Sequence, residues 1–528
     1  MRYGHVALGA AVLLVIALPG QAQDTPKATP AAEAAHPDGH DHSDKAAPKS
    51  AQLLEGYGNG GFAVTGASPA AQAFFSNGME LAAAFAHKAS IVAMEEAVRL
   101  DPACAMCHWG LAYAAGPTIN YGKGWPERKK LYAMLGTAAD LANKSGTKRE
   151  RDLIGVFRKR YVPGATTAQR DRQFVKDMLK LVKRYPDDNT IAVLTADAII
   201  QAMEEDSYKS EALRATVLLE TVLARAPNDT PAIHFYIHAS EIAGVPARAE
   251  PYADKLGALA PRASHLVHMP SHTFYWVGRY QDAATVNHRA VELGKDNAIR
   301  LGMTEPDGVW GLPYHAHNVI FGLGGALMAG DAKIGLELGR PLVDRSQGQE
   351  KAHPVMQLLS AAGYFALARF DDPAAVLARP KPKLPYLTAA WHYARGEVFA
   401  KQGDMAGLKA EIAALEAMQI PPPEKGESKA PDQMVQIVRL VLTGRLAMAE
   451  GRWADAQAAF RTAAEIEETP DFMQFADPPA FWYPVRRDYA AALLAAGDKA
   501  GALRELDASL KLRPKDPVAM ELRAKVAG

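Results

Sequence analysis

The sequence predicts an all-α fold, a superhelix (α-solenoid) of helical hairpins with irregular repeats. From about residue 66 onward the chain is rich in alanine with apolar residues at helical spacing, and strand-like alternation is nearly absent. Turns that contain glycine separate the helical segments. Two of these turns, GVPARA at 244–249 and GRYQDA at 278–283, begin 34 residues apart, which indicates an internal repeat.

Two segments precede the array. Residues 1–22 combine Arg2, a short apolar core and small residues up to Ala22, which is the pattern of a cleaved signal peptide. We therefore expect a periplasmic or secreted protein with no membrane span after signal cleavage. Residues 23–65 contain few large apolar side chains and include HPDGHDHSDK at 36–45, which predicts a disordered leader.

Length and charge narrow the class of protein. The chain has 528 residues, more than one ordinary hydrophobic core includes. We therefore expect two stretches of array, at residues 66–345 and 346–528. Lys+Arg and Asp+Glu are balanced at 59 each, which argues against a nucleic-acid partner.

The array resembles the tetratricopeptide repeat (TPR) family. The resemblance rests on the 34-residue period, on small residues where helices cross, and on further turns, GRWADA at 451–456 and GDKAGA at 497–502. HFYIHASE and HLVHMPSHTFYWVGRYQDA also resemble segments of exported bacterial TPR-repeat proteins without an established activity. The resemblance implies that Ala249, Ala283 and Ala456 are buried at helix crossings. It also implies a concave groove, lined by the second, fifth, ninth and twelfth places of each first helix.

Histidines concentrate on these groove-lining places. Of the 16 histidines, seven lie between residues 234 and 317, not counting His288. We take Gly244, Gly278 and Gly330 as the fifteenth places of their repeats. The groove places are then occupied by His234, His238, Glu241, His265, His268, His272 and His317, and His315 lies just before the third of these helices. Because residues three or four apart share one face of a helix, we expect the rings to converge.

This cluster predicts a transition-metal site. Neutral imidazoles are good ligands for copper and zinc, and iron is a further candidate. A site of histidines with one carboxylate and an open coordination place would permit catalysis. Because the ligands must be deprotonated, we expect metal occupancy to fall as the pH drops through about 6.

Two alternatives to a metal site remain. In the first, the groove binds a protein, a peptide or a small anion, and the histidines act as hydrogen-bond donors. Its aromatic anchors would be Tyr275, Trp276, Trp310 and Tyr314. In the second, the histidines are structural and pack between repeats.

The two cysteines lie in CAMCH at 104–108. C-x-x-C-H is the attachment motif of c-type haem, in which Cys104 and Cys107 would bind the vinyl groups and His108 the iron. A covalent haem would displace the neighbouring repeats, whereas a disulfide at a helix start would not. We therefore expect a disulfide or dithiol, with haem c and ligation of a soft metal as alternatives.

Overall fold

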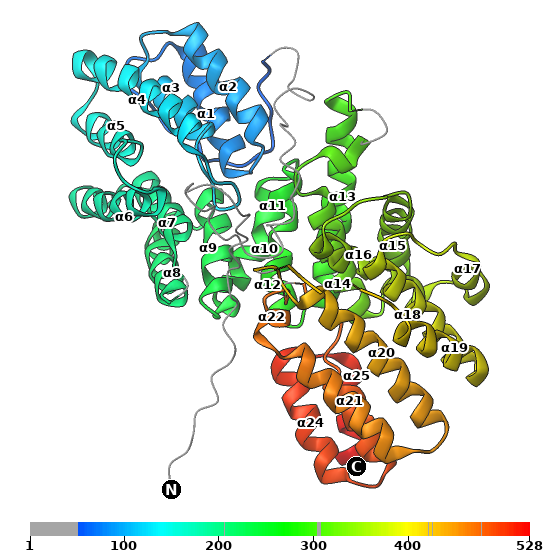
Figure 1. Cartoon of the computed structure of the whole chain (residues 1–528). Coiled ribbons are helices and arrows are strands. Elements are labelled where there is room, and N and C mark those ends of the chain that lie inside the picture. Colours follow the sequence, from blue (N-terminus) through cyan, green and yellow to red (C-terminus); the bar gives the residue numbers. More distant parts are fainter. Residues whose placement is uncertain are drawn as a thin grey trace, which may run out of the picture.

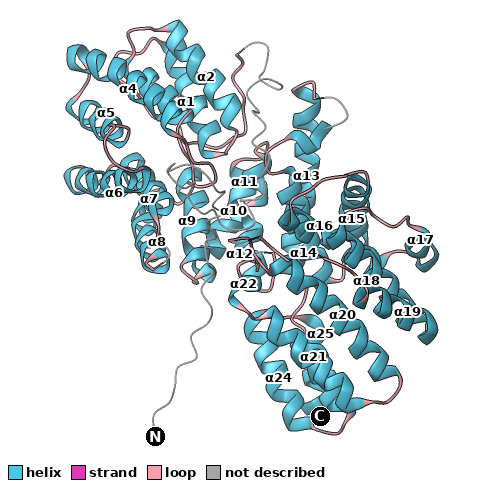
Figure 2. Ribbon diagram, viewed as in Figure 1, coloured by secondary structure: helices cyan, strands magenta, loops and turns pink. Residues whose placement is uncertain are grey.

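The computed structural model describes residues 51–204, 206–303, 308–420, 422–424, 426–476 and 478–527. Within these ranges the chain forms helices joined by short turns, and no strand is present (Figures 1 and 2). Successive helices pair into antiparallel hairpins that stack side by side along the chain. The predicted fold class, an all-α superhelix of TPR-like helical hairpins, is confirmed.

We divide the array into three parts. The N-terminal arm contains α1 (Pro69–Ala83), α2 (His87–Leu100), α3 (Ala105–Ala114), α4 (Trp125–Ser145), α5 (Lys148–Arg160), α6 (Thr167–Arg184), α7 (Asn189–Ala202) and α8 (Tyr208–Arg225). The central segment contains α9 (Thr230–Ile242), η1 (Pro246–Ala249), α10 (Glu250–Leu259), α11 (Ser264–His268), α12 (Pro270–Trp276), α13 (Tyr280–Arg300), η2 (Gly308–Gly311) and α14 (His315–Ala329). The C-terminal arm contains α15 (Ala332–Gln347), α16 (Pro354–Phe370), α17 (Pro373–Ala378), α18 (Pro385–Gln402), α19 (Met405–Glu416), α20 (Ala430–Ala449), α21 (Trp453–Glu467), α22 (Pro470–Met473), α23 (Arg486–Ala495), α24 (Lys499–Leu512) and α25 (Pro517–Ala527).

Glycine turns set the phase of the central repeats. Gly244, Gly278 and Gly330 have φ values of 76°, 78° and 81°, in the left-handed region that glycine occupies without a Cβ penalty. Each of them follows the first helix of a hairpin, as the predicted register requires.

Small residues allow the helices to cross closely. Ala249, Ala283 and Ala456 are fully buried, which confirms the prediction for all three. At the crossing of α13 and α14, a Cβ added to Gly325 would lie 2.6 Å from the backbone nitrogen of Ala284. The sequence register therefore holds in both the central segment and the C-terminal arm.

Both ends of the described chain contact the central segment. The backbone nitrogen of Arg262 donates to the carbonyl oxygen of Gly56, and Asn59 hydrogen-bonds Thr230 at the start of α9. At the other end, the Tyr280 hydroxyl donates to the carbonyl oxygen of Pro514 at 2.8 Å. The central segment is thus enclosed by both arms, and it lies between them in Figure 1.

The structure describes only part of the predicted leader, and it packs the two predicted stretches of array against each other without a break. Residues 1–50, which include the expected signal peptide and most of the leader, lie outside the described residues. Disorder is the wrong expectation for residues 51–65, because Tyr57 is buried and Leu54 donates its backbone N–H to Asn77. The hydrophobic core continues from Val343 to Leu358, and the division at residue 345 stays a prediction.

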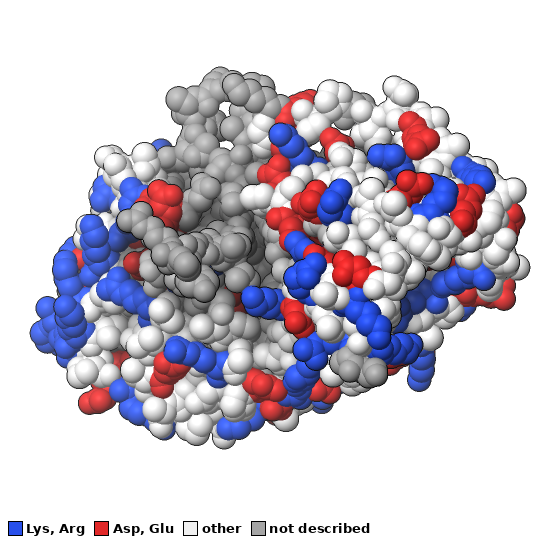
Figure 3. All heavy atoms as spheres, turned by 90° about the horizontal axis from the view of Figure 1, so that it is seen from below, with Lys and Arg blue, Asp and Glu red and all other residues white. Residues whose placement is uncertain are grey.

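Two surface properties bear on partners. None of the described helices combines the length and the apolar character needed to cross a bilayer. Basic and acidic side chains are interspersed on the face shown in Figure 3, in keeping with the balanced charge of the sequence. The expectation that nucleic acid is not a partner stays a prediction.

Candidate metal centre

Helix α9 presents two of the predicted histidines on one face. Asp229 caps the helix by accepting a hydrogen bond from the backbone nitrogen of Ala232 at 2.9 Å, and Pro231 occupies the first turn, where a missing N–H is tolerated. His234 and His238 are four residues apart, so their rings lie on the same side, with centroids 5.0 Å apart. The helix thereby directs two imidazoles toward the next repeat.

The next first helix is broken in two by a proline. Pro270 lacks the N–H that would continue the helical ladder, and the chain divides at Met269 into α11 and α12. His265 and His268 lie on α11, and His272 lies on α12. These three residues contribute to two different groups of ligands.

The first group, which we call triad one, consists of His234, His238 and His265. One ligand nitrogen from each ring can be chosen so that all three lie within 4.8 Å of one another. The Nε2 atoms of His265 and His234 are 3.1 Å apart. All three side chains are at least 95% buried.

The second group, triad two, consists of His268, His272 and His317, the last of them from α14. The Nε2 atom of His268 lies 3.0 Å from that of His272 and 2.9 Å from that of His317. Two nitrogens at 2.0–2.1 Å from one tetrahedral ion would be about 3.3 Å apart. The nitrogens of triad two are therefore close to the spacing that a shared ion requires.

Hydrogen bonds outside triad two fix two of its rings. The Asn287 amide nitrogen donates to the carbonyl oxygen of Ala283, which turns the Asn287 oxygen toward His268. That oxygen therefore accepts from Nδ1 of His268, at 2.6 Å. A carboxylate oxygen of Glu241 likewise accepts from Nδ1 of His272, at 2.9 Å. Both rings therefore carry their proton on Nδ1 and direct an Nε2 lone pair at each other.

Triad one has fewer such bonds. Nδ1 of His234 donates to the carbonyl oxygen of Ala83 at 2.7 Å, across 151 positions of sequence. Nε2 of His238 and Nδ1 of His265 are buried without a hydrogen-bond partner. Triad one is thus held at its edge by the N-terminal arm, and it contains two unsatisfied nitrogens.

An aromatic ring packs against each triad. Phe85 lies 4.5 Å from His234 and 4.7 Å from His265, measured between ring centroids. Phe321 lies 4.3 Å from His272, 4.5 Å from His317 and 4.9 Å from His268. These rings keep water from one side of each triad and lower the local dielectric, which strengthens electrostatic interactions.

Burial disfavours protonation of the histidine rings in the cluster. Loss of solvation lowers the pKa of His234 to about 3, and it lowers the pKa values of His238, His265 and His268 well below their usual range. Neighbouring imidazoles act in the same direction. These four rings are therefore neutral at pH 7, the form in which imidazole binds a metal.

Two predicted ligands lie outside the triads. Glu241 accepts hydrogen bonds from Nδ1 of His272 and from the Trp276 indole nitrogen, so it orients His272 from behind. His315 belongs to neither triad, and its ring packs edge-on against Trp310 at 4.8 Å. His315 begins α14, two residues before His317, and this places its ring on another face of the helix.

The aromatic anchors expected for a partner are only partly available. Tyr275 is fully buried, and Tyr314 is 8% exposed, with its hydroxyl accepting a hydrogen bond from Asn120. Trp276 and Trp310 are half-buried, and the former donates to Glu241. The two tyrosines are therefore not available as anchors, because Tyr314 packs against the N-terminal arm and Tyr275 packs against Tyr280 and Arg513.

The cysteine pair forms a disulfide at the start of α3. Cys104 and Cys107 are joined, and both are buried. His108 places its Nε2 atom 3.0 Å from the carbonyl oxygen of Pro102. The expectation of a disulfide is confirmed. With both sulfurs joined, neither is available for a bond to haem or to a soft metal in this form, and those two alternatives stay untested predictions.

Some contributors could not be read from the sequence. Asn287 and the Ala83 carbonyl come from a second helix and from the distant N-terminal arm, and neither belongs to the groove pattern. Phe85 adopts a left-handed conformation, with φ of 55°, after α1. Phe321, by contrast, could have been identified from the sequence, because it follows His317 by four positions and lies on the same face of the helix.

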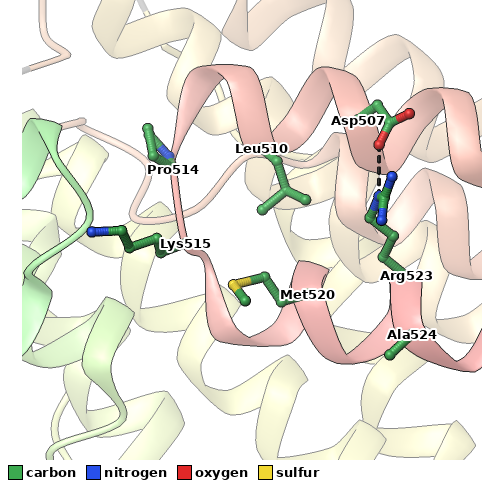
Figure 4. Close-up of a pocket in the computed structure, with 7 residues that line it drawn as sticks. All are labelled: Asp507, Leu510, Pro514, Lys515, Met520, Arg523 and Ala524. Atoms are coloured by element: carbon green, nitrogen blue, oxygen red, sulfur yellow. Dashed lines mark hydrogen bonds and ion pairs between the residues drawn. The ribbon is translucent and has the colours of Figure 1, made fainter.

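A separate hollow lies at the C-terminal end of the array. Figure 4 shows it between α24 and α25, with Leu510 and Met520 facing one another and Arg523 donating to Asp507. None of the six triad histidines lines this hollow.

Comparisons with known proteins add little to these observations. No protein-family model matches the chain, and no curated protein sequence matches it. The structure is similar to the human IFIT1 dimer with m7Gppp-AAAA, at 11% identity and a TM-score of 0.31 over 77% of this chain and 90% of that one. It is similar to yeast Tom70, at 12% identity and a TM-score of 0.34 over 87% and 95% of the two chains. It is also similar to the APC/C hetero-tetramer Cut9-Hcn1, at 11% identity and a TM-score of 0.30 over 87% and 76%. At these values the likeness does not extend to function.

Proposed function

We propose that the chain is an exported protein that binds a transition metal, copper or zinc, through its buried histidine cluster. Iron is a further candidate. The six ligands are the members of triads one and two, and Glu241 orients one of them. The signal-peptide pattern at residues 1–22 and the Cys104–Cys107 disulfide support export, because disulfides persist in oxidising compartments.

One observation carries the proposal. The Nε2 atoms of His268 and His272 lie 3.0 Å apart, and the acceptors Asn287 and Glu241 hold the proton of each ring on Nδ1. The lone pairs of His268 and His272 then face each other, and no hydrogen bond can join these two atoms, although His317 Nε2 lies within donating distance of His268. Burial opposes a proton there, whereas a metal ion would bind both lone pairs.

The hydrogen bonds made by the ring nitrogens that face away from the triads also support metal binding. Histidines that bind a metal usually donate their other ring N–H to a carboxylate or a carbonyl oxygen, which fixes the ring and raises its basicity. His234, His268 and His272 each have such an acceptor: a backbone carbonyl, an amide oxygen and a carboxylate respectively. A buried structural histidine would also need an acceptor for its N–H, so these bonds support the proposal together with the opposed lone pairs of His268 and His272.

Metal analysis tests the proposal. The full-length protein, purified without a metal-binding tag, is stripped with a chelator and titrated with zinc or copper. We expect tight binding by the wild type and its loss in the double variant His268→Gln/His272→Gln. A matched control is His288→Gln, because His288 is a partly exposed histidine that pairs with Glu337 outside the cluster.

Circular dichroism of each variant checks that the array remains folded. If the wild type binds neither metal more tightly than the folded double variant, the proposal fails. The chain would then be a scaffold that binds a protein or a peptide.

A further inference from the structure

The two triads repeat one pattern along the superhelix. Each consists of the fifth and ninth places of one repeat and the second place of the next: His234, His238 and His265, then His268, His272 and His317. Each triad also has one phenylalanine against it, Phe85 or Phe321. The chain therefore builds the same ligand set twice, one repeat apart.

The two ligand sets form one continuous shell. Ring centroids within a triad are 4.5–6.4 Å apart. Across the triads, His238 lies 5.5 Å from His272, and His265 lies 5.6 Å from His268. His238 and His272 are equivalent ninth places, so the distance between them approximates the step from one triad to the other.

The number and type of the ligands favour copper. Every ligand is a neutral imidazole, a nitrogen donor, and among divalent first-row ions copper binds such donors most strongly. A structural zinc site uses four protein ligands in a tetrahedron, and each triad supplies three. Three histidines with an open place would also suit a catalytic zinc ion, so the choice of copper rests on its stronger binding to nitrogen donors. Glu241 does not complete either set, because its two oxygens accept from His272 and Trp276.

We propose that triads one and two together bind a pair of copper ions, one in each triad, close enough for their unpaired electrons to interact. This inference rests on the proposed metal-binding function and adds the number, the identity and the mutual distance of the ions. Their separation is of the same order as the 5.5 Å between the equivalent rings of His238 and His272.

Copper stoichiometry and electron paramagnetic resonance test this inference. Stripped full-length protein is loaded with copper(II) sulfate, desalted and analysed. We expect two copper ions per chain and a spectrum with a half-field transition, or with less integrated intensity than two isolated ions give. This measurement requires no variant, so misfolding cannot obscure it.

Variants that remove the ligands of one triad provide a second, independent test. His234→Gln/His265→Gln should reduce the stoichiometry to one copper, with the full spectrum of an isolated ion, and His317→Gln should remove the other copper. His288→Gln is the control, and it should retain two coupled ions.

Each other outcome has a distinct meaning. One copper per wild-type chain, unchanged by loss of triad one, overturns the pair but leaves the proposed function intact. Two coppers whose signals add as independent ions overturn the interaction between them. Binding of zinc without copper overturns the choice of metal, and binding of neither metal defeats the proposed function itself.

Discussion

Triads one and two use the same repeat positions but are held in place differently. In triad two, side-chain acceptors on α9 and α13 fix the rings of His272 and His268. In triad one, the backbone carbonyl of Ala83 fixes His234, and nitrogens of His238 and His265 lack a hydrogen-bond partner. The residues outside the ligands therefore distinguish two sites whose ligands are alike.

The difference decides which triad can exist without a metal. In triad one, His265 can donate Nε2–H to the lone pair of His234, 3.1 Å away, so this pair is satisfied as an ordinary hydrogen bond. In triad two, the tautomers fixed by Asn287 and Glu241 leave the lone pairs of His268 and His272 opposed. His317 can donate Nε2–H to that of His268, 2.9 Å away, but no hydrogen bond can form between His268 and His272 themselves. Triad two should therefore bind the first ion and bind it more tightly.

The largest expected effect is that of acid, which should act on histidines of both triads. Burial lowers the pKa of His234 to about 3 and shifts those of His238, His265 and His268 in the same direction. Between about pH 3 and 6.5 the unfolded chain therefore binds protons that the folded chain does not. The stability of the metal-free protein should fall as the pH drops below 6.5 and recover as it rises.

Metal release should accordingly coincide with unfolding, and both should occur well below the pH of about 6 that the sequence alone suggested. Parallel measurements of ellipticity and of released metal during an acid titration check this. Release near pH 6.5 from a protein that is still folded would show that the ligands titrate as exposed histidines do.

A smaller effect should separate the triads. Asn287→Ala removes the acceptor of His268, and loss of such an outer partner typically weakens metal affinity about 10–100-fold. The loss should fall on the tighter of two phases in a competition titration against a chelator. Asn297→Ala is a matched control, because Asn297 lies on the same helix and contacts Arg300. Equal weakening of both phases would contradict the proposed difference.

The smallest effect should come from the disulfide. Cys104→Ser/Cys107→Ser opens a short loop in the N-terminal arm and should cost about 2 kcal/mol of folding free energy. The melting temperature should fall, while the affinity of triad two stays unchanged. Triad one should weaken slightly at most, since it contacts this arm through Ala83. Calorimetry measures the melting temperature, and the same competition titration measures the metal affinities. A larger loss of affinity at triad two than at triad one would contradict the conclusion that the N-terminal arm supports only triad one.

The fold and most of the ligand set could be predicted from the sequence because both depend on local periodicity. Glycine turns at Gly244, Gly278 and Gly330 fixed the phase, and phase alone identified the six histidines that converge. Their division into two triads was not predicted, because it depends on the break at Pro270 and on spacing between repeats. The role of Glu241 was also beyond the pattern, which shows that a residue faces the groove but not what it binds.

Other features depend on contacts between distant segments. The Ala83 carbonyl and Phe85 reach the centre from the N-terminal arm, and no local signal relates them to His234. The same arm contacts Tyr314 through Asn120, which makes this tyrosine unavailable as an aromatic anchor. Periodicity identifies what a repeat contains, whereas the curvature of the superhelix decides which repeats meet.

The return of both chain ends to the central segment has a consequence for folding order. Most contacts in a repeat array join neighbours in sequence, and such contacts form early because short loops close at little entropic cost. The bonds around the centre instead join residues 151, 194 and 234 positions apart. Contacts of this kind form late. The histidine shell should therefore be completed only after the N-terminal arm and the central segment have both folded. If the proposed metal binding is correct, loading of the metal then follows these long-range contacts rather than preceding them.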